Sequence, residues 1–261
     1  MYVLPALEAA LAGSSFAGKL HFSPVTGSTN TDAVQAARAG APHGSVYFAD
    51  EQQAGRGRGN HGWRSAAGEG LYVSVLLRPA LPAARLPLLP LAAGLAASQA
   101  IRAASGLSID LRWPNDLLIG ERKCGGILME SKIADGAVNF AVVGIGINVH
   151  QRDFDEGLAT PATSLDLESG CHVSRQALLV ALLKSLEREA LALQAETAGG
   201  VLACRLEDAS TWLRGRHVVV HGPQACVGVT AGLDDNGFLL VETVDGRMTV
   251  QTGGLRAAQI G

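Results

Sequence analysis

The segment 55–63, with the sequence GRGRGNHGW, can form neither an α-helix nor an ordinary β-strand. Glycine permits positive φ angles and allows the backbone to lie close against a ligand. Arg56 and Arg58 each carry a permanent, forked positive charge that suits phosphate and carboxylate oxygens. The segment therefore predicts one of two structures, a flexible surface turn or a mobile cationic loop that closes over an anion.

The pattern on both sides of this loop is typical of an α+β domain. Short runs rich in β-branched and aromatic residues predict strands. An alanine-rich segment predicts a buried helix, and two later segments with helical spacing predict two more helices. The expected strands are 45–50, 71–78, 108–112, 126–132 and 140–149, and the expected helices are 88–104, 174–195 and 201–213.

The character of the chain changes after Trp212. Four short β segments follow, at 217–220, 226–230, 238–243 and 248–251, and Asp-, Asn- and Gly-containing turns separate them. Closely spaced strands of this kind predict a small β-barrel or sandwich. We therefore expect two domains, residues 1–213 and residues 214–261.

The composition describes a protein that can bury a sizeable core. Of 261 residues, 48% are hydrophobic, and the formal net charge is −3. This charge argues against a nucleic-acid-binding protein whose whole surface is basic, although it permits a local basic pocket. Four scattered cysteines without a C-x-x-C pair suit a reducing cytosol. With no basic signal-peptide start and no apolar stretch longer than 86–100, we expect a cytoplasmic protein without membrane association.

Two polar segments near the loop are candidates for ligand contact. Ser28, Thr29 and Asn30 precede the helical pattern AVQAARAG. Ser28 or Thr29 would cap a helix and still leave hydroxyl and N–H groups for a polar ligand. Gln52 carries donors and an acceptor, so it could bind an amide or ureido group, unless it is an ordinary surface glutamine.

The segment Trp113-Pro114-Asn115-Asp116 follows a predicted strand. Pro114 fixes its own φ and restricts Trp113, so Asn115 and Asp116 are held rigidly at the strand end. Asp116 could orient a basic side chain or hold Mg²⁺ on a phosphate. A plain proline turn is the alternative.

Two glycine-containing segments complete the set. Lys123 stands just before Gly125 and Gly126, where its ammonium could stabilise charge on a carboxylate or phosphate during acyl transfer, unless it is a solvated lysine in a turn. The alternating glycines of GIGINV at 144–149 predict close packing against a strand backbone, with Asn148 as its polar end. Neither a dinucleotide fingerprint nor a Walker motif is present, so any nucleotide is bound by another device.

Five motifs, taken in order, resemble the bacterial biotin protein ligases. They are STNT at 28–31, QQAGRGRGNHGW at 52–63, RWPNDLL at 112–118, RKCGGILMES at 122–131 and GIGINV at 144–149. The resemblance runs from about Phe22 to Arg256. It implies a mixed central sheet with helices and a small C-terminal SH3-like β-barrel.

The resemblance also implies a reaction in two steps. Biotin and ATP with Mg²⁺ give biotinyl-5′-AMP and pyrophosphate, and the acyl group then passes to a lysine of a biotin carboxyl carrier protein. It assigns catalytic roles to Arg58, Lys123 and Asp116, the last only as an aid to the acceptor lysine. The residues that it assigns to biotin are Ser28, Thr29, Asn30, Gln52, Gly55, Arg56, Arg58, Lys123, Gly125 and Gly126. Those that it assigns to ATP and the adenylate are Arg56, Arg58, Trp63, Asn115, Asp116, Lys123 and Asn148, while Mg²⁺ is expected to arrive on the ATP phosphates.

Three features bear on how far the resemblance extends. His61 replaces an arginine that is frequent in the family, so one phosphate contact could be weaker or pH-dependent. Only about twenty-five residues precede the first motif, so we expect a ligase that does not bind DNA. Separately, we expect a monomer or weak homodimer. The rival functions are a lipoate or octanoate ligase, although the R-R-x-S-G-G-G-type segment is lacking, and a non-catalytic biotin sensor.

Overall fold

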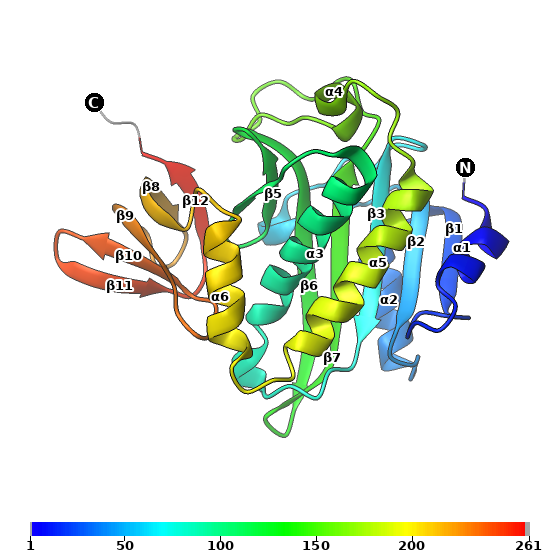
Figure 1. Cartoon of the computed structure of the whole chain (residues 1–261), viewed down its shortest axis with the longest axis horizontal. Helices are drawn as coiled ribbons and strands as arrows, with labels where there is room; N and C mark the ends of the chain where they lie inside the picture. Colours follow the sequence, from blue (N-terminus) through cyan, green and yellow to red (C-terminus); the bar gives the residue numbers. More distant parts are fainter. Residues whose placement is uncertain (1, 259–261) are drawn as a thin grey trace.

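The computed structural model describes residues 2–258 of the chain. A large mixed sheet forms the centre of the molecule, and a smaller antiparallel sheet lies beside one end of it (Figure 1). This arrangement confirms the expected α+β fold, and the second sheet fits an SH3-like unit. The chain begins on the far side of the large sheet from the small one (Figure 1).

The large sheet has seven strands in the spatial order β1-β2-β3-β7-β6-β5-β4. Only β1 and β2 pair in parallel, and every other neighbouring pair is antiparallel. The strands are β1 (Leu20–Thr26), β2 (Ser45–Gln52), β3 (Gly70–Leu77), β4 (Asp110–Arg112), β5 (Asp116–Ile119), β6 (Arg122–Ala134) and β7 (Ala137–Asn148).

Helices cover the two faces of this sheet unequally. The long helices α3 and α5 lie side by side across one face, and α2 packs on the other (Figure 1). The N-terminus of α5 is capped by Ser174, whose hydroxyl accepts a hydrogen bond from the amide of Ala177. The helices are α1 (Leu4–Ala10), α2 (Thr29–Arg38), α3 (Leu88–Ser105), α4 (Leu165–Ser169), α5 (Arg175–Ala192) and α6 (Ala198–Asp208), with 3₁₀ turns η1 (Arg58–Asn60) and η2 (Ala83–Arg85).

The alternation of side chains along β7 separates the core from a polar face. Val143, Ile145 and Ile147 are buried in the main hydrophobic core, beneath the long helices. The intervening residues, Gly144 and Gly146, face the side of the sheet on which α2 begins. Because successive residues of a strand point to opposite faces, the same strand builds the core and one wall of a polar cavity.

The small sheet has the order β11-β10-β9-β8-β12 and begins at Arg214, directly after buried Trp212 and Leu213. It packs on the main body: the indole Nε1 of Trp113 donates to the carbonyl of Gly237 at 3.1 Å. Its strands are β8 (Arg214–His221), β9 (Cys226–Leu233), β10 (Leu239–Thr243), β11 (Gly246–Val250) and β12 (Gly254–Ala257).

Several expected boundaries were wrong. The helix expected at 201–213 is α6, which ends at Asp208, because Ser210 and Thr211 instead bond to the backbone of Leu111 and the carboxylate of Asp110. The Asn115-Asp116 turn leads directly into the short strand β5. The segments that form α1 and β1 had no strong pattern and were not expected.

The segment Ala83–Ser105 is long and apolar enough to cross a membrane by length and composition. However, 67% of its apolar window is buried within the protein, where α3 packs on α5 and on the sheet. This burial identifies α3 as a core helix, in agreement with the buried helix expected at 88–104.

Candidate active site

A cavity of about 900 Å³ opens on the polar face of the large sheet. The N-terminus of α2, the loop 55–63 and the ends of β6 and β7 surround it, and the segment before β12 closes one side. A cavity of this size is typical of a small-molecule site. Nearly all the candidate residues line it, including Ser28, Gln52, Arg58, Lys123 and Asn148.

A chain of hydrogen bonds runs across the start of α2. Thr29 donates to Gln52 Oε1 from both its amide, at 2.9 Å, and its hydroxyl, at 3.1 Å. The hydroxyl of Thr29 also lies 2.8 Å from that of Ser74, which donates to Asn30 Oδ1 at 2.7 Å. Because these partners fix the rotamers, the chain presents a rigid set of neutral donors and acceptors to the cavity.

Ser28 occupies the N-cap position of α2, as expected, but its hydroxyl does not cap the helix. The residue is only 5% exposed and lines the cavity. A polar side chain buried at a helix N-terminus, close to unpaired backbone N–H groups, is well placed to bind a polar ligand.

The alternating glycines of β7 make room for two side chains, which confirms the close packing expected there. A Cβ on Gly144 would lie 2.1 Å from Oδ1 of Asn30, and a Cβ on Gly146 would lie 2.7 Å from Nε1 of Trp63. Trp63 therefore packs directly on the backbone of Gly146 at the cavity wall. Among residues 2–258, none accepts a hydrogen bond from its buried Nε1, so this donor is available to a ligand.

The cationic loop is folded into a small hairpin rather than a disordered turn. Gly57 donates to the carbonyl of His61 at 2.7 Å, and the amide of Trp63 donates to the carbonyl of Gly55 at 2.9 Å. A Cβ on Gly55 would lie 2.3 Å from the carbonyl oxygen of Trp63, so only glycine fits there. His61 is exposed and lies at the cavity lining.

The two arginines of the loop line the cavity and have different partners. Arg56 Nη2 forms an ion pair of 2.6 Å with Oε2 of Glu130, which also accepts from Asn30. Arg58 Nη1 donates to Asn115 Oδ1 at 3.3 Å and to the carbonyl of Gly253 at 3.0 Å. Arg58 thus connects the loop to the small sheet. Burial lowers the pKa of Arg58, although Asp116 opposes the shift and the guanidinium stays charged.

Three charged groups meet beneath the loop. Lys123 Nζ lies 2.5 Å from Asp116 Oδ1, and Arg112 donates to Asp116 Oδ2 at 2.7 Å and 3.1 Å. Burial by itself favours the neutral acid, but Lys123 and Arg112 hold the pKa of Asp116 below its ordinary value. Both oxygens of Asp116 are therefore engaged, which favours the expected orienting role over a role as metal ligand or base.

The remaining candidates have distinct positions. Asn115 donates from Nδ2 to the carbonyl of Ile127 at 2.9 Å, and Asn148 donates to the carbonyl of Thr163 at 3.0 Å. Gly126 lies under Lys123, with the lysine Cε 3.4 Å from where a Cβ would stand. Gly125 packs against the carbonyl of Gly146, on the strand β7 that forms one wall of the cavity.

Sequence reasoning missed Ser74, Glu130 and Arg112, each of which holds a candidate residue in place. Ser74 and Glu130 lie inside predicted strands, where period-two alternation gives their face but not their partner. Arg112 is only 8% exposed, and its role depends on a pairing with Asp116 across the Pro114 turn. The segment 153–160, which lines the cavity, carried no pattern at all.

The seven-stranded mixed sheet, with its polar cavity under a glycine–arginine loop, matches the fold of the biotin protein ligases. The model of the Biotin/lipoate A/B protein ligase family matches residues 22–148. The chain belongs to this family.

Known relatives and structures narrow the class. The chain is 36% identical to the bifunctional ligase/repressor BirA of Bacillus spizizenii, over 87% of this chain and 70% of that one. It is also 36% identical to the biotin–[acetyl-CoA-carboxylase] ligase of Mycobacterium tuberculosis, over 88% and 85%. The biotin protein ligase of Aquifex aeolicus, solved with biotin and ATP, superposes with a TM-score of 0.79 at 29% identity, covering 92% of this chain and 100% of that one.

Proposed function

We infer that the chain is an ATP-dependent biotin ligase, which activates biotin as biotinyl-5′-AMP and transfers it to a lysine of a carrier protein. The observation that supports this most strongly is the division of one cavity into two parts. A neutral hydrogen-bonding set around Thr29 and Gln52 lies beside a cationic set formed by Arg56, Arg58 and Lys123. Biotin has the matching division, with a neutral ureido head and an anionic carboxylate.

We place the biotin head at the start of α2. Ser28, Thr29 and Gln52 offer hydroxyl, amide and carbonyl groups to the cavity. Asn30 is held by Ser74 and Glu130 and fixes the shape of this wall. Neutral side chains suit a neutral ureido ring. A charged side chain at this place would lose its hydration on binding, and the ureido ring would supply no opposite charge in return.

The first step brings two anions together, and the cationic set offsets their repulsion. A carboxylate oxygen of biotin attacks the α-phosphorus of ATP, the bond to the β-phosphate oxygen breaks, and pyrophosphate leaves. Lys123 is positioned by Asp116 to contact both the carboxylate and the α-phosphate, while Arg58 covers them from the loop. When bound, Mg²⁺ would neutralise phosphate charge, and we propose that it arrives with ATP, since Asp116 is already engaged.

In the second step an uncharged lysine amine of the carrier attacks the acyl carbon, the bond from that carbon to the phosphate oxygen breaks, AMP leaves, and the amine releases one proton to solvent. No nucleophile of the ligase takes part. We propose that Trp63 and the loop 55–63 keep water from the mixed anhydride, because Trp63 already lies against Gly146 at the cavity wall. Asn115 and Asn148 would bind the nucleotide from the adjoining strand ends.

The setting of the reaction follows from the same features. We propose that residues 1–213 form the catalytic domain and residues 214–261 a small domain that helps to close the cavity through Gly253. Since one chain builds the whole cavity, we propose a monomer or weak homodimer. The four free cysteines among the described residues support a reducing, cytoplasmic setting.

One experiment tests this function directly. The purified protein is incubated with ATP, Mg²⁺ and a biotin carboxyl carrier domain, with either biotin or lipoate, and the carrier is weighed by mass spectrometry. We expect one biotinyl group on the carrier with biotin and no modification with lipoate. Modification by lipoate alone, or by neither acid, would overturn the proposal.

A further inference from the structure

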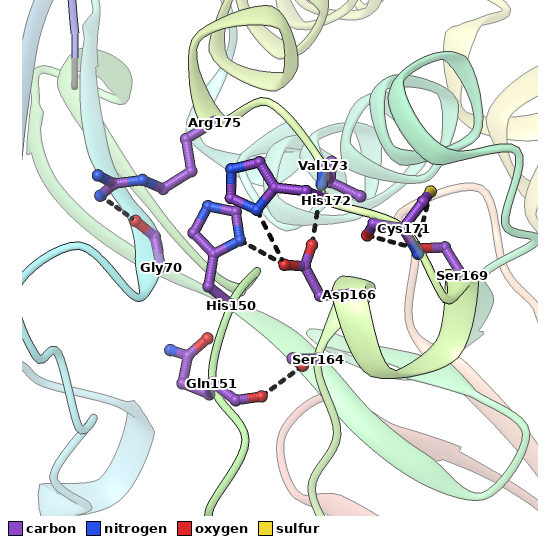
Figure 2. Close-up of polar contacts among 10 residues, drawn as sticks. All are labelled: Gly70, His150, Gln151, Ser164, Asp166, Ser169, Cys171, His172, Val173 and Arg175. Carbon is purple, nitrogen blue, oxygen red and sulfur yellow. Dashed lines mark hydrogen bonds and ion pairs between the residues drawn. The ribbon is translucent and has the colours of Figure 1, made fainter.

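Two histidines and an aspartate meet outside the cavity, at the junction of β7, α4 and α5. His150 Nδ1 lies 2.8 Å from Asp166 Oδ2, and His172 Nδ1 lies 3.3 Å from the same oxygen. Figure 2 shows the two imidazoles side by side, with both Nδ1 atoms directed at this one carboxylate oxygen. Their ring centroids are 4.3 Å apart and the planes differ by 13°.

We propose that His150, Asp166 and His172 form a binding site for a divalent transition-metal cation of the Zn²⁺ class. The three ligand atoms all lie within 4.8 Å of one another. In a tetrahedral zinc site the ligand atoms stand roughly 3.3 Å apart, so small side-chain rotations suffice to seat the ion. Two imidazole nitrogens and one carboxylate oxygen favour Zn²⁺, Co²⁺ or Ni²⁺ over Mg²⁺ and Ca²⁺.

The backbone holds these ligands in place before any ion arrives. Asp166 Oδ1 accepts a hydrogen bond of 2.9 Å from the amide of Val173, which leaves Oδ2 directed at the imidazoles. The amide of Asp166 donates to the carbonyl of Val149, and the amide of His150 donates to the carbonyl of Glu69. Such outer contacts orient metal ligands and raise their affinity.

The charge and exposure of the cluster also suit a cation. With neutral imidazoles the three ligands carry one negative charge. The guanidinium of Arg175 points away from them, toward the carbonyl of Gly70 (Figure 2). The side chain of His172 is 79% exposed, so an ion can enter from solvent and keep a water as its fourth ligand. The thiol of Cys171 is directed to Ser169 rather than to the cluster (Figure 2).

The position of the site gives the ion a role. His150 and Asp166 stand at the two ends of the segment 151–165, which carries Phe154, Leu158 and Thr160 to the cavity wall. A cation bound to both would fix the base of this segment. The site does not take part in the chemistry, so its test is independent of the ligase function.

The test measures Zn²⁺ binding to the full chain without nucleotide, by equilibrium dialysis at pH 7.5 in excess Mg²⁺, together with thermal unfolding. We expect one Zn²⁺ per chain with micromolar affinity and a Tm rise of about 5 °C at saturation. His172→Ala and His150→Ala should each weaken binding by at least about tenfold and remove the Tm rise.

Two control variants separate this site from other ligands. His217→Ala removes an exposed histidine of β8, and Cys171→Ser removes the neighbouring thiol; both should bind Zn²⁺ as the wild type does. Because His172 is exposed, its replacement should leave the fold intact. The proposal is overturned if the wild type binds no Zn²⁺ at micromolar concentration, if both histidine variants bind normally, or if Cys171→Ser abolishes binding.

Discussion

Lys123 and Asp116 form an ion pair of 2.5 Å at the base of the cavity. Arg112 occupies the other oxygen of the same carboxylate, so the ammonium of Lys123 is held in one orientation while it remains partly exposed to the cavity. A cation fixed in this way can stabilise developing charge without reorganising during the reaction. We therefore expect the pair both to stabilise the fold around β5 and to position Lys123 for the reaction that we propose.

Asp116→Asn tests the contribution of this pair to stability. The substitution leaves Lys123 and Arg112 without their buried counter-charge, so we expect a loss of about 3 kcal/mol in the free energy of unfolding at pH 7. The folded pKa of Asp116 is depressed, so its contribution is complete above the ordinary carboxyl pKa and is lost as pH falls through the folded value. Urea unfolding should show the difference from wild type shrinking below about pH 4.

The matched control is Asp155→Asn, which removes an exposed carboxylate 3.9 Å from Arg64. This variant should change stability by less than about 0.5 kcal/mol, because exposed pairs contribute little. Equal stability of Asp116→Asn and wild type at pH 7 would show that the cluster does not depend on its carboxylate.

Arg58→Ala tests the loop as a cover over the adenylate. The substitution removes the contacts with Asn115 and with the carbonyl of Gly253, and it removes a charge facing the phosphate. We expect biotinyl-5′-AMP to dissociate at least about tenfold faster, measured by stopped-flow displacement. Arg247→Ala, which removes an exposed guanidinium of β11 outside the cavity lining, should behave as wild type. If Arg58→Ala retained the adenylate as tightly as wild type, our assignment of the loop would be wrong.

Gly146→Ala tests the packing of Trp63. A methyl group there would lie 2.7 Å from the indole Nε1, so the ring must move away from the sheet. We expect a stability loss of about 1–3 kcal/mol and weaker ATP binding, measured by urea unfolding and calorimetry. Gly27→Ala is the control, because a Cβ there meets nothing within 4 Å. Normal ATP affinity in Gly146→Ala would remove Trp63 from the nucleotide site.

The four cysteines should differ sharply in reactivity. Burial raises the pKa of the Cys124 thiol to about 12 and closes it to reagents, whereas Cys171 and Cys204 are exposed. Titration with a thiol reagent at pH 8 should modify Cys171 and Cys204 quickly and Cys226 more slowly. Cys124 should react only after denaturation, and its rapid modification in the native protein would contradict the buried position.

Much of the fold could be predicted from local pattern. The strands around the glycine loop, the buried helix α3 and four of the five strands of the small sheet follow from hydrophobic periodicity and turn residues, whereas the short β12 was not expected. The segments α1 and β1 could not be predicted, because α1 is short and β1 has mostly half-exposed positions with Pro24 inside it. Tertiary pairing decides such elements, rather than propensity.

The residues of the site likewise fall into those that the sequence indicated and those that it could not. Glycine and arginine spacing pointed to the loop, and the paired glycines at 144 and 146 pointed to close packing that Asn30 and Trp63 supply. The partners Ser74 and Glu130 could not be found from spacing, because contacts across strands depend on register. Likewise, no sequence pattern brings His150, Asp166 and His172 together, since they meet only where β7 ends beside α4.

The most direct test of the account is biotin-dependent exchange of labelled pyrophosphate into ATP, in the absence of any carrier. The wild type should catalyse exchange with biotin and not with lipoate. Lys123→Ala should lower the rate by about a hundredfold or more, whereas Lys132→Ala, exposed on the same strand β6, should leave it unchanged. Exchange that persists at the wild-type rate in Lys123→Ala, or that does not require biotin, would contradict the central claim that this lysine and its cationic neighbours bring the two anions together.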